Sequence, residues 1–339
     1  MNQPFEHSIE DKVAFLSCPQ SYPDAFDKVD VIETHLSWLF QTPQYVYKLK
    51  KPLIHVSQDL TSLAARHRNC LQEVRLNRRL AAAVYLGAVP LSADVDGDLH
   101  LGPQGTPVDW LVHMRRLPTE RMLDTMIKND RVHTSDLFPI AHLLAEFYNR
   151  AKPVQLSGEK YRKRLLCGIR QHCEPLLNLA KELPLPQLER VLEWQTQMLH
   201  THARLFDQRM EERHLIEAHG DLKPEHLCLL TPPVIIDCLE FSLDLRTLDP
   251  VDELCFLTME CDKLGAPFIG EMTLKIYSRL NGDHPPLPLL QFYKSYRALW
   301  RAKLAALHLD ERPLKKSNHW RQLVQLYLSQ AEHYFVHAP

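Results

Sequence analysis

The hydrophobic pattern of this chain changes its period near residue 119, and that change constrains the fold more than any other feature. Before it, residues 31–40 and 44–51 are rich in β-branched and aromatic side chains and flank the turn-like sequence QTPQ, which predicts a β-hairpin. Residues 59–80 repeat apolar side chains near helical spacing, and residues 88–118 alternate again around an Asp-Gly turn. The beginning of the chain therefore predicts a mixed lobe of sheet and helix.

From Thr119 onward the pattern is helical. Helices are expected near residues 135–151, 158–180, 185–212, 250–264, 271–280, 287–309 and 316–336. The one interruption lies between about residues 216 and 241, where β-branched and turn residues predict a short hairpin. We therefore expect an α+β protein with a small mixed lobe at residues 1–118 and a larger, mainly helical lobe at residues 119–339.

Composition argues against several classes of partner. The 40 basic and 42 acidic side chains give a net charge of −2, so no overall field attracts nucleic acid or an anionic membrane. No stretch approaches the ~18 apolar residues of a membrane-spanning helix, and the N-terminus does not resemble a secretory signal. The eight cysteines are scattered without a C-x-x-C pair, which favours reduced thiols. We expect a cytoplasmic protein and predict no particular oligomeric state.

The interruption carries the sequence HGDLKPEHLCLL at residues 219–230, which has the layout of a phosphoryl-transfer loop. Such a reaction needs a carboxylate to accept a proton, oxygen ligands for Mg²⁺, and a lysine on the nucleotide phosphates. Asp221 is the candidate base, on a tight turn that Gly220 permits. Asp237 ends the strand-like run VIID and is the candidate metal ligand. The two acids are expected to face one cleft.

Seven motifs, in order, resemble the aminoglycoside phosphotransferase family of the protein-kinase-like superfamily, and in particular a bacterial branch of predicted small-molecule kinases. The motifs are ETHLSWLFQTPQYVYKLKKP, EVRLNRRLAAAVYLGAVPL, HMRRLP, HGDLKPEHLCL, VIIDCLEF, LDPVDEL and FYKSYRALWRAKLAALHL. The resemblance covers most of the chain. It implies a protein-kinase-like two-lobed fold with a hinge at about residues 113–118, ATP and Mg²⁺ as cofactors, and a small-molecule acceptor.

The resemblance assigns roles to individual residues. Lys48 matches the lysine that pairs with nucleotide phosphates, and Glu73 matches the acid that holds it. Lys50, on the same face of the strand, is the fallback, although a basic strand end taken alone is more often solvated. His219 is expected to orient the catalytic loop. Further nucleotide contacts are expected from Thr34 and Ser37 and from the hinge backbone of His113, Met114 and Arg115.

Two more acids, Asp249 and Asp252, lie in the motif LDPVDEL at the start of a predicted helix. Carboxylates at this position cap the positive end of a helix. The resemblance adds that one of the two braces the catalytic loop. We therefore expect both acids to support the structure and not to take part in the chemistry.

The chain departs from the family pattern five residues after the base. The family has a metal-binding asparagine there, whereas this chain has His226, and Mg²⁺ prefers oxygen ligands. Three outcomes are open: His226 turns away and Asp237 alone holds one metal, Glu240 supplies the missing oxygen, or the site binds nucleotide without turnover. We favour Glu240, because the chain loses an oxygen ligand and gains a carboxylate nearby.

The sequence gives weaker evidence about the acceptor than about the nucleotide site. Lys294, Arg297 and Arg301 share one face of the predicted helix at residues 287–309. If this basic stripe lines the substrate site, the acceptor is anionic or hydroxyl-rich and is not an aminoglycoside. A solvated face that is paired with nearby acids explains the same spacing.

Three functions compete for this sequence. The leading hypothesis is an ATP-dependent phosphotransferase that acts on a small hydroxyl- or amine-bearing molecule. The second is a nucleotide-binding pseudokinase with little catalysis, which His226 supports. The third is a metal-dependent hydrolase with a mixed cage of His219, Asp221, His226 and Asp237.

Overall fold

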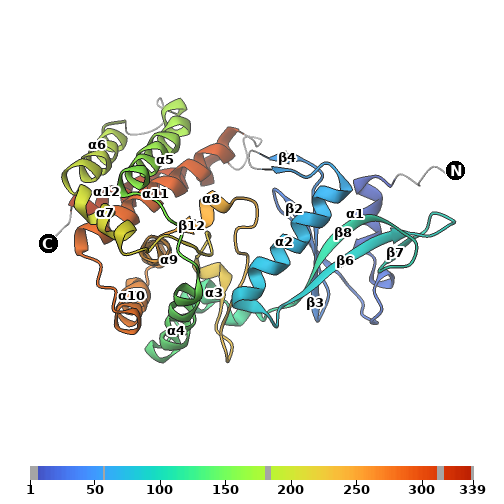
Figure 1. Ribbon diagram of the computed structural model, residues 1–339. Coiled ribbons are helices and arrows are strands. Elements are labelled where there is room, and N and C mark those ends of the chain that lie inside the picture. The colour runs from blue at the N-terminus through green and yellow to red at the C-terminus, as the bar shows by residue number, and fades with distance from the viewer. Residues whose placement is uncertain (1–6, 56–57, 180–184, 311–316, 337–339) are drawn as a thin grey trace. The chain divides into compact units, whose positions relative to one another are not determined.

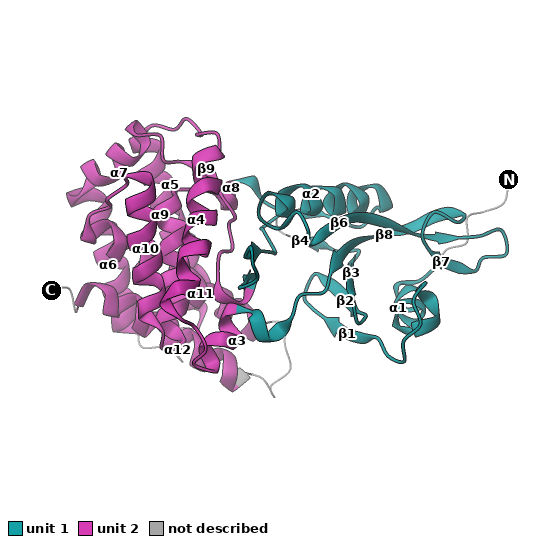
Figure 2. Ribbon diagram, turned by 90° about the horizontal axis from the view of Figure 1, so that it is seen from below, with its two compact units in different colours: residues 1–122, 226–243 teal, residues 123–225, 244–339 magenta. Residues whose placement is uncertain are grey.

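The computed structural model describes residues 7–55, 58–179, 185–310 and 317–336. The α+β chain divides into two compact units, of which unit 1 comprises residues 1–122 and 226–243 and unit 2 the remainder (Figure 2). The expected boundary at residue 118 thus moves to Met122. Residues 226–243, expected in the helical lobe, belong to unit 1 instead.

A six-stranded antiparallel sheet forms the frame of unit 1. Its strands are, in spatial order, β1 (Asp30–Glu33), β2 (Ser37–Gln41), β3 (Tyr45–Lys50), β8 (Thr106–Arg115), β6 (Tyr85–Ala93) and β7 (Leu99–Leu101). Strands β2 and β3 form the hairpin that was predicted around QTPQ. Residues 31–40, expected as one strand, are instead two strands, because the N–H and hydroxyl of Thr34 both donate to the Ser37 carbonyl and turn the chain.

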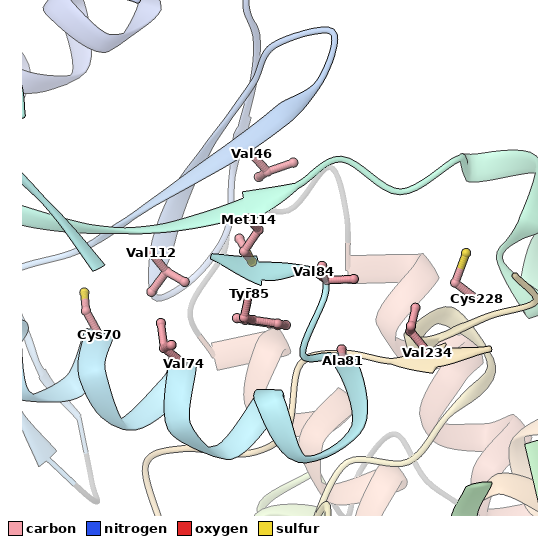
Figure 3. Close-up of a cluster of buried hydrophobic side chains, with 10 residues drawn as sticks. All are labelled: Val46, Cys70, Val74, Ala81, Val84, Tyr85, Val112, Met114, Cys228 and Val234. Atoms are coloured by element: carbon pink, nitrogen blue, oxygen red, sulfur yellow. The ribbon is translucent and has the colours of Figure 1, made fainter. Parts of the chain in front are cut away.

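Helix α2 (Leu63–Ala81) packs on one face of this sheet, against β6 and β8 (Figure 1). Ser62 begins the helix by accepting the N–H of Ala65. Ten buried side chains form a hydrophobic cluster under the helix (Figure 3). The cluster consists of Val46, Cys70, Val74, Ala81, Val84, Tyr85, Val112, Met114, Cys228 and Val234. Burial of these apolar surfaces holds α2 on the sheet.

Alternation along β3 gives the sheet two apolar faces. Val46 joins the α2 cluster, whereas Tyr47 and Leu49 pack in a second cluster with Leu16 of helix α1 (Ile9–Ser17). The α2-facing side of β3 therefore also carries every second residue after Val46, and these residues are two lysines.

A short hairpin explains why residues 226–243 belong to unit 1. Strand β10 (Leu227–Cys228) pairs with β11 (Val234–Ile235), and one residue from each strand packs in the α2 cluster. The Leu229 N–H also donates to the Arg121 carbonyl at 2.8 Å. Two further short strands, β4 (Ile54–His55) and β5 (Gln58–Asp59), pair with each other and precede α2 in the sequence.

Unit 2 is helical. Its main helices are α3 (Leu123–Lys128), α4 (Thr134–Arg150), α5 (Gly158–Asn178), α6 (Leu185–Thr201), α7 (Ala203–Glu211), α9 (Pro250–Lys263), α10 (Pro267–Asn281), α11 (Leu287–Asp310) and α12 (Ser317–Val336). Helix α9 is buried from Pro250 to Cys261 and packs against α10 and α11, so it forms the centre of this unit. The helix expected at residues 185–212 is broken at His202 into α6 and α7.

Two short strands mark the interruption of the helical pattern within unit 2. Strand β9 (Ile216–Glu217) pairs with β12 (Thr247–Leu248), which follows the short helix α8 (Leu243–Arg246). The pair anchors the chain just before the loop at residue 219. Among the described residues, no helix has the length and apolar character that a membrane span requires.

Candidate functional site

Strand β3 presents Lys48 and Lys50 on its α2-facing side. The Nζ atom of Lys48 lies 2.9 Å from an oxygen of Glu73 on α2 and 3.1 Å from an oxygen of Asp237, which follows β11. The fold therefore brings together the lysine, the glutamate and the metal ligand that the sequence predicts for a phosphate site.

Lys50 occupies the buried side of the same group of charges. Its Nζ atom pairs with the second oxygen of Glu73 and lies 2.6 Å from an oxygen of Glu240. Glu240, which the sequence favoured as a metal ligand, thus already has a counter-charge. This pairing argues against a position for Glu240 on the metal.

The neighbouring opposite charges determine the protonation states of Lys48 and Glu73. Burial alone would lower the pKa of Lys48, but the charges of Asp237 and Glu73 outweigh burial and hold that pKa well above its usual value. Burial likewise opposes ionisation of Glu73, yet Lys48 and Lys50 lower its pKa. The lysines and the glutamate are therefore charged at neutral pH, and Lys48 is suited to bind phosphate oxygens.

Asp237 has a left-handed backbone conformation, with φ of 61°. Its N–H donates to the Tyr85 hydroxyl at 3.1 Å, and the N–H of Cys238 donates to the Asn77 side chain at 2.8 Å. These bonds hold a conformation that non-glycine residues seldom adopt. They leave the Asp237 side chain about half exposed.

His226 is buried and faces Asp237. Its Nε2 atom lies 3.3 Å from the carboxylate oxygen of Asp237 that Lys48 does not contact. His226 therefore does not turn away from the candidate metal ligand. An accessible carboxylate with phosphate oxygens and water suits Mg²⁺, whereas an imidazole does not. The donor set fits one Mg²⁺ ion on Asp237.

The backbone expected to bind adenine is partly used by the sheet. The Arg115 N–H, at the end of β8, donates to the Val84 carbonyl at 2.9 Å. The Arg116 N–H donates to a carbonyl of the β2–β3 turn at 2.8 Å. The N–H of Arg115, one of the three residues expected to contact adenine, is therefore already bonded within unit 1.

Thr34 and Ser37, which were expected to bind phosphate, bond to each other in the turn between β1 and β2. The Thr34 hydroxyl donates to the Ser37 carbonyl at 2.8 Å and accepts the Ser37 N–H at 3.0 Å. The Ser37 side chain is buried. The Ser37 hydroxyl is therefore too deep to reach a phosphate, and a contact from this turn would have to come from its backbone or from Thr34.

The catalytic loop lies in unit 2, where a carboxylate of α9 holds its backbone. Glu253 accepts the N–H of His219 at 2.9 Å and the N–H of Gly220 at 2.6 Å. The Tyr148 hydroxyl donates to the same carboxylate at 2.9 Å, and burial raises the pKa of Glu253. Gly220 has φ of 91°, where a side chain would be strained, so the turn requires glycine.

Glu253 performs the bracing role that was expected of Asp249 or Asp252. Asp249 instead caps α9 by accepting the Val251 N–H at 2.9 Å, as predicted for a capping carboxylate, and pairs with Arg209 at 2.7 Å. Asp249 is the N-cap of this helix, and Asp252 and Glu253 lie in its first turn. Sequence could not select Glu253, because the orientation of α9 decides which acid faces the loop.

Lys223, which the sequence did not single out, lies beside the candidate base. Its Nζ atom lies 3.0 Å from Asp221 and 3.5 Å from Glu225. Burial would lower the pKa of Lys223, but the charge of Asp221 raises it. The Asp221 N–H donates to Nδ1 of His219 at 3.3 Å, and the orienting role of that histidine stays a prediction. The signal for Lys223 was its place two residues after the base.

The basic stripe of α11 faces the acids of α9. Three ion pairs join the helices: Arg297 with Asp252 (2.6 Å), Arg301 with Glu260 (2.7 Å) and Lys294 with Asp262 (3.4 Å). The alternative interpretation is therefore right that nearby acids pair with all three basic residues, but the face is not solvated throughout, because Arg297 is buried.

The hydrolase hypothesis required one cage of four donors. His219 and Asp221 belong to unit 2, whereas His226 and Asp237 belong to unit 1. Within the described ranges, no group of three or more histidine, cysteine, aspartate or glutamate side chains is arranged to hold a metal ion.

No protein-family model matches the chain. Two curated relatives are 30% identical to it over 292 residues: the uncharacterized protein Rv2004c of Mycobacterium tuberculosis and the uncharacterized protein Mb2027c of Mycobacterium bovis. The alignment covers 84% of this chain and 56% of each relative. The chain thus spans little more than half the length of these relatives.

Solved structures identify the fold. A choline/ethanolamine kinase family protein from Mesorhizobium loti matches with a TM-score of 0.58 and 14% identity, over 97% of this chain and 95% of that one. Aminoglycoside 2′-phosphotransferase-IIIa in its GDP complex matches with a TM-score of 0.57 and 15% identity, over 95% and 99%. Choline kinase from Cryptosporidium parvum matches with a TM-score of 0.54 and 12% identity, over 96% and 94%. The chain therefore has the protein-kinase-like fold of the choline kinases and aminoglycoside phosphotransferases, which confirms the predicted resemblance at the level of the fold.

Proposed function

We propose that this protein is an ATP-dependent phosphotransferase that acts on a small hydroxyl- or amine-bearing molecule. The observation that carries the proposal is the position of the Lys48 ammonium group between Glu73 and Asp237. A buried glutamate that holds a lysine, beside an accessible carboxylate, supplies two of the parts that phosphoryl transfer requires of a protein. Asp221, on the loop that Glu253 braces, supplies the third part, the base.

Lys48 would exchange one partner when a nucleotide binds. Without nucleotide it neutralises Asp237, and phosphate oxygens would replace that carboxylate. Bound Mg²⁺ would neutralise the phosphate charge, with Asp237 as its protein ligand. Lys48 keeps Glu73 in both states, so the lysine stays oriented during the exchange.

Asp221 would accept the proton of the acceptor as the phosphoryl group moves. Its carboxylate pairs with Lys223 at 3.0 Å. Lys223 also places a positive charge beside the base, where it can offset the negative charge of the transferred group.

The nucleobase would bind near the end of β8. Leu117 and Ile236 pack at the edge of the α2 cluster and offer apolar surface to a purine ring. The GDP complex of aminoglycoside 2′-phosphotransferase-IIIa, which has the same fold, supports the use of a purine nucleotide.

The acceptor is proposed not to be a polycation. A polycation needs carboxylates that have no other counter-charge. The acids of α9 already have partners: Glu260 pairs with Arg301 and Lys263, and Asp262 pairs with Lys294. These pairs lower the attraction of this helix for an amine-rich substrate.

A catalytically weak nucleotide-binding protein is the second candidate. His226 replaces an oxygen ligand and lies against Asp237. An imidazole leaves fewer oxygen donors for a second Mg²⁺ ion, which would slow transfer without preventing nucleotide binding.

Thermal unfolding with and without Mg²⁺-ATP tests both candidates. Saturating Mg²⁺-ATP is expected to raise the Tm of the wild type, since a ligand that binds only the folded state stabilises it. Asp237→Ala is expected to remove most of this rise, while the exposed-site control Asp96→Ala keeps it. Asp221→Asn is expected to keep the rise but to lose ATP consumption. A wild type that shows no rise with any nucleoside triphosphate would reject both candidates.

A further inference from the structure

We propose that Lys50 and Glu240 form a positioning pair that fixes the orientation of Glu73 and holds the metal-binding segment on unit 1. The catalytic meaning of this inference rests on the proposed function. Its structural part stands on unit 1 alone. Neither residue is proposed to touch the nucleotide, because both act through Glu73 and Asp237.

Five charged side chains form a continuous series of ion pairs. The series runs from Asp237 through Lys48, Glu73 and Lys50 to Glu240. Lys48 contacts one oxygen of Glu73, and Lys50 contacts the other. Because both oxygens are held, the Glu73 carboxylate has a fixed orientation when Lys48 exchanges its second partner.

The series is buried at one end and open at the other. The side chains of Lys50, Glu73 and Glu240 are 2%, 1% and 9% exposed, whereas that of Asp237 is 45% exposed. A charge that is removed from water is costly unless it keeps its partner. Lys50 and Glu240 are therefore expected to stay bound to each other, whereas the more exposed end of the series, at Asp237, can exchange partners.

The same pair is a further anchor for the segment at residues 236–240. The N–H of Asp237 bonds to β6 through Tyr85, and the N–H of Cys238 bonds to α2 through Asn77. The contact of Glu240 with Lys50 adds β3 to these supports. Loss of the pair should loosen the segment even when no nucleotide is bound.

Amide hydrogen exchange of the nucleotide-free protein tests the anchor directly. Lys50→Met and Glu240→Gln are each expected to speed exchange at residues 236–240 by about tenfold. The double variant is expected to exchange no faster than either single variant, because the two side chains act as one pair. The matched control is Lys51→Met, which removes a lysine that pairs with the exposed Glu33. Unchanged exchange in both single variants and in the double variant would overturn the inference. If a single variant does not fold, the double variant, which removes both charges, decides.

ATP affinity with and without Mg²⁺ separates positioning from metal ligation. A positioning pair predicts that Lys50→Met and Glu240→Gln weaken ATP binding by a similar factor, roughly tenfold, whether or not Mg²⁺ is present. A ligand role for Glu240 predicts that Glu240→Gln weakens binding only with Mg²⁺, and this result would overturn the inference. A wild type that binds no ATP counts against the proposed function, and hydrogen exchange then still decides whether the pair is an anchor.

Discussion

The carboxylate of Glu253 accepts the backbone N–H of His219 at 2.9 Å, and both residues are buried. Through this bond, the central helix of unit 2 determines the path of the loop that carries Asp221. The shape of the loop therefore depends on the folded core of unit 2.

Replacing Glu253 should destabilise unit 2 and the loop together. Glu253→Ala leaves two buried N–H groups and the Tyr148 hydroxyl without their acceptor, which should cost about 3 kcal/mol. Chemical denaturation measures the loss, with the exposed Glu271→Ala as control. Equal stability of the two variants would contradict the bracing role.

The loss of stability on replacing a basic residue of α11 should be larger where its ion pair is more deeply buried. Arg297→Met leaves Asp252 as a buried, unpaired charge and should cost about 3–5 kcal/mol. Lys294→Met removes a longer and more exposed pair with Asp262 and should cost less than about 1 kcal/mol. Urea unfolding of the two variants checks this order, and a stable Arg297→Met protein would reopen a substrate role for that residue.

His226→Asn should improve the metal site. The substitution returns an amide oxygen to a position beside Asp237, and Mg²⁺ prefers oxygen to imidazole nitrogen. We expect faster ATP consumption and a lower Mg²⁺ requirement in a titration of rate against metal concentration. A slower variant would instead make His226 a working participant in the reaction.

The stability that Glu73 provides should be lost in acid. Its pKa in the folded protein is below the ordinary value of 4.5, so its contribution is present above that value and is lost as pH falls through the folded pKa. The difference in unfolding free energy between the wild type and Glu73→Gln should thus be largest at neutral pH and should shrink below pH 4.5. Denaturation curves across this range, with Glu271→Gln as control, provide the measurement; a constant difference would contradict the ion-pair account.

Local patterns predicted the helices well because burial of one helix face repeats within a few residues. The expected helices at residues 135–151, 158–180 and 250–264 correspond to α4, α5 and α9. The break at His202 and the turn after Thr34 depend on single backbone conformations inside apolar patterns, so periodicity did not predict them.

Long-range pairs explain most of what the sequence did not predict in the site. Lys48 and Glu73 were identified by resemblance to a family motif. The partnership of Lys50 with Glu240 joins residues 190 positions apart, and neither residue carries a local sign of the other. For the same reason, the sequence did not predict that residues 226–243 belong to unit 1. This depends on how one short hairpin packs against α2.

Unit 1 is assembled from two segments, at residues 1–122 and 226–243, with part of unit 2 between them in the chain. During translation, Lys48 leaves the ribosome 189 residues before Asp237. In the described part of the chain, five helices of unit 2, α3 to α7, are made before the β10–β11 hairpin that completes unit 1, so the two units mature in an interleaved order.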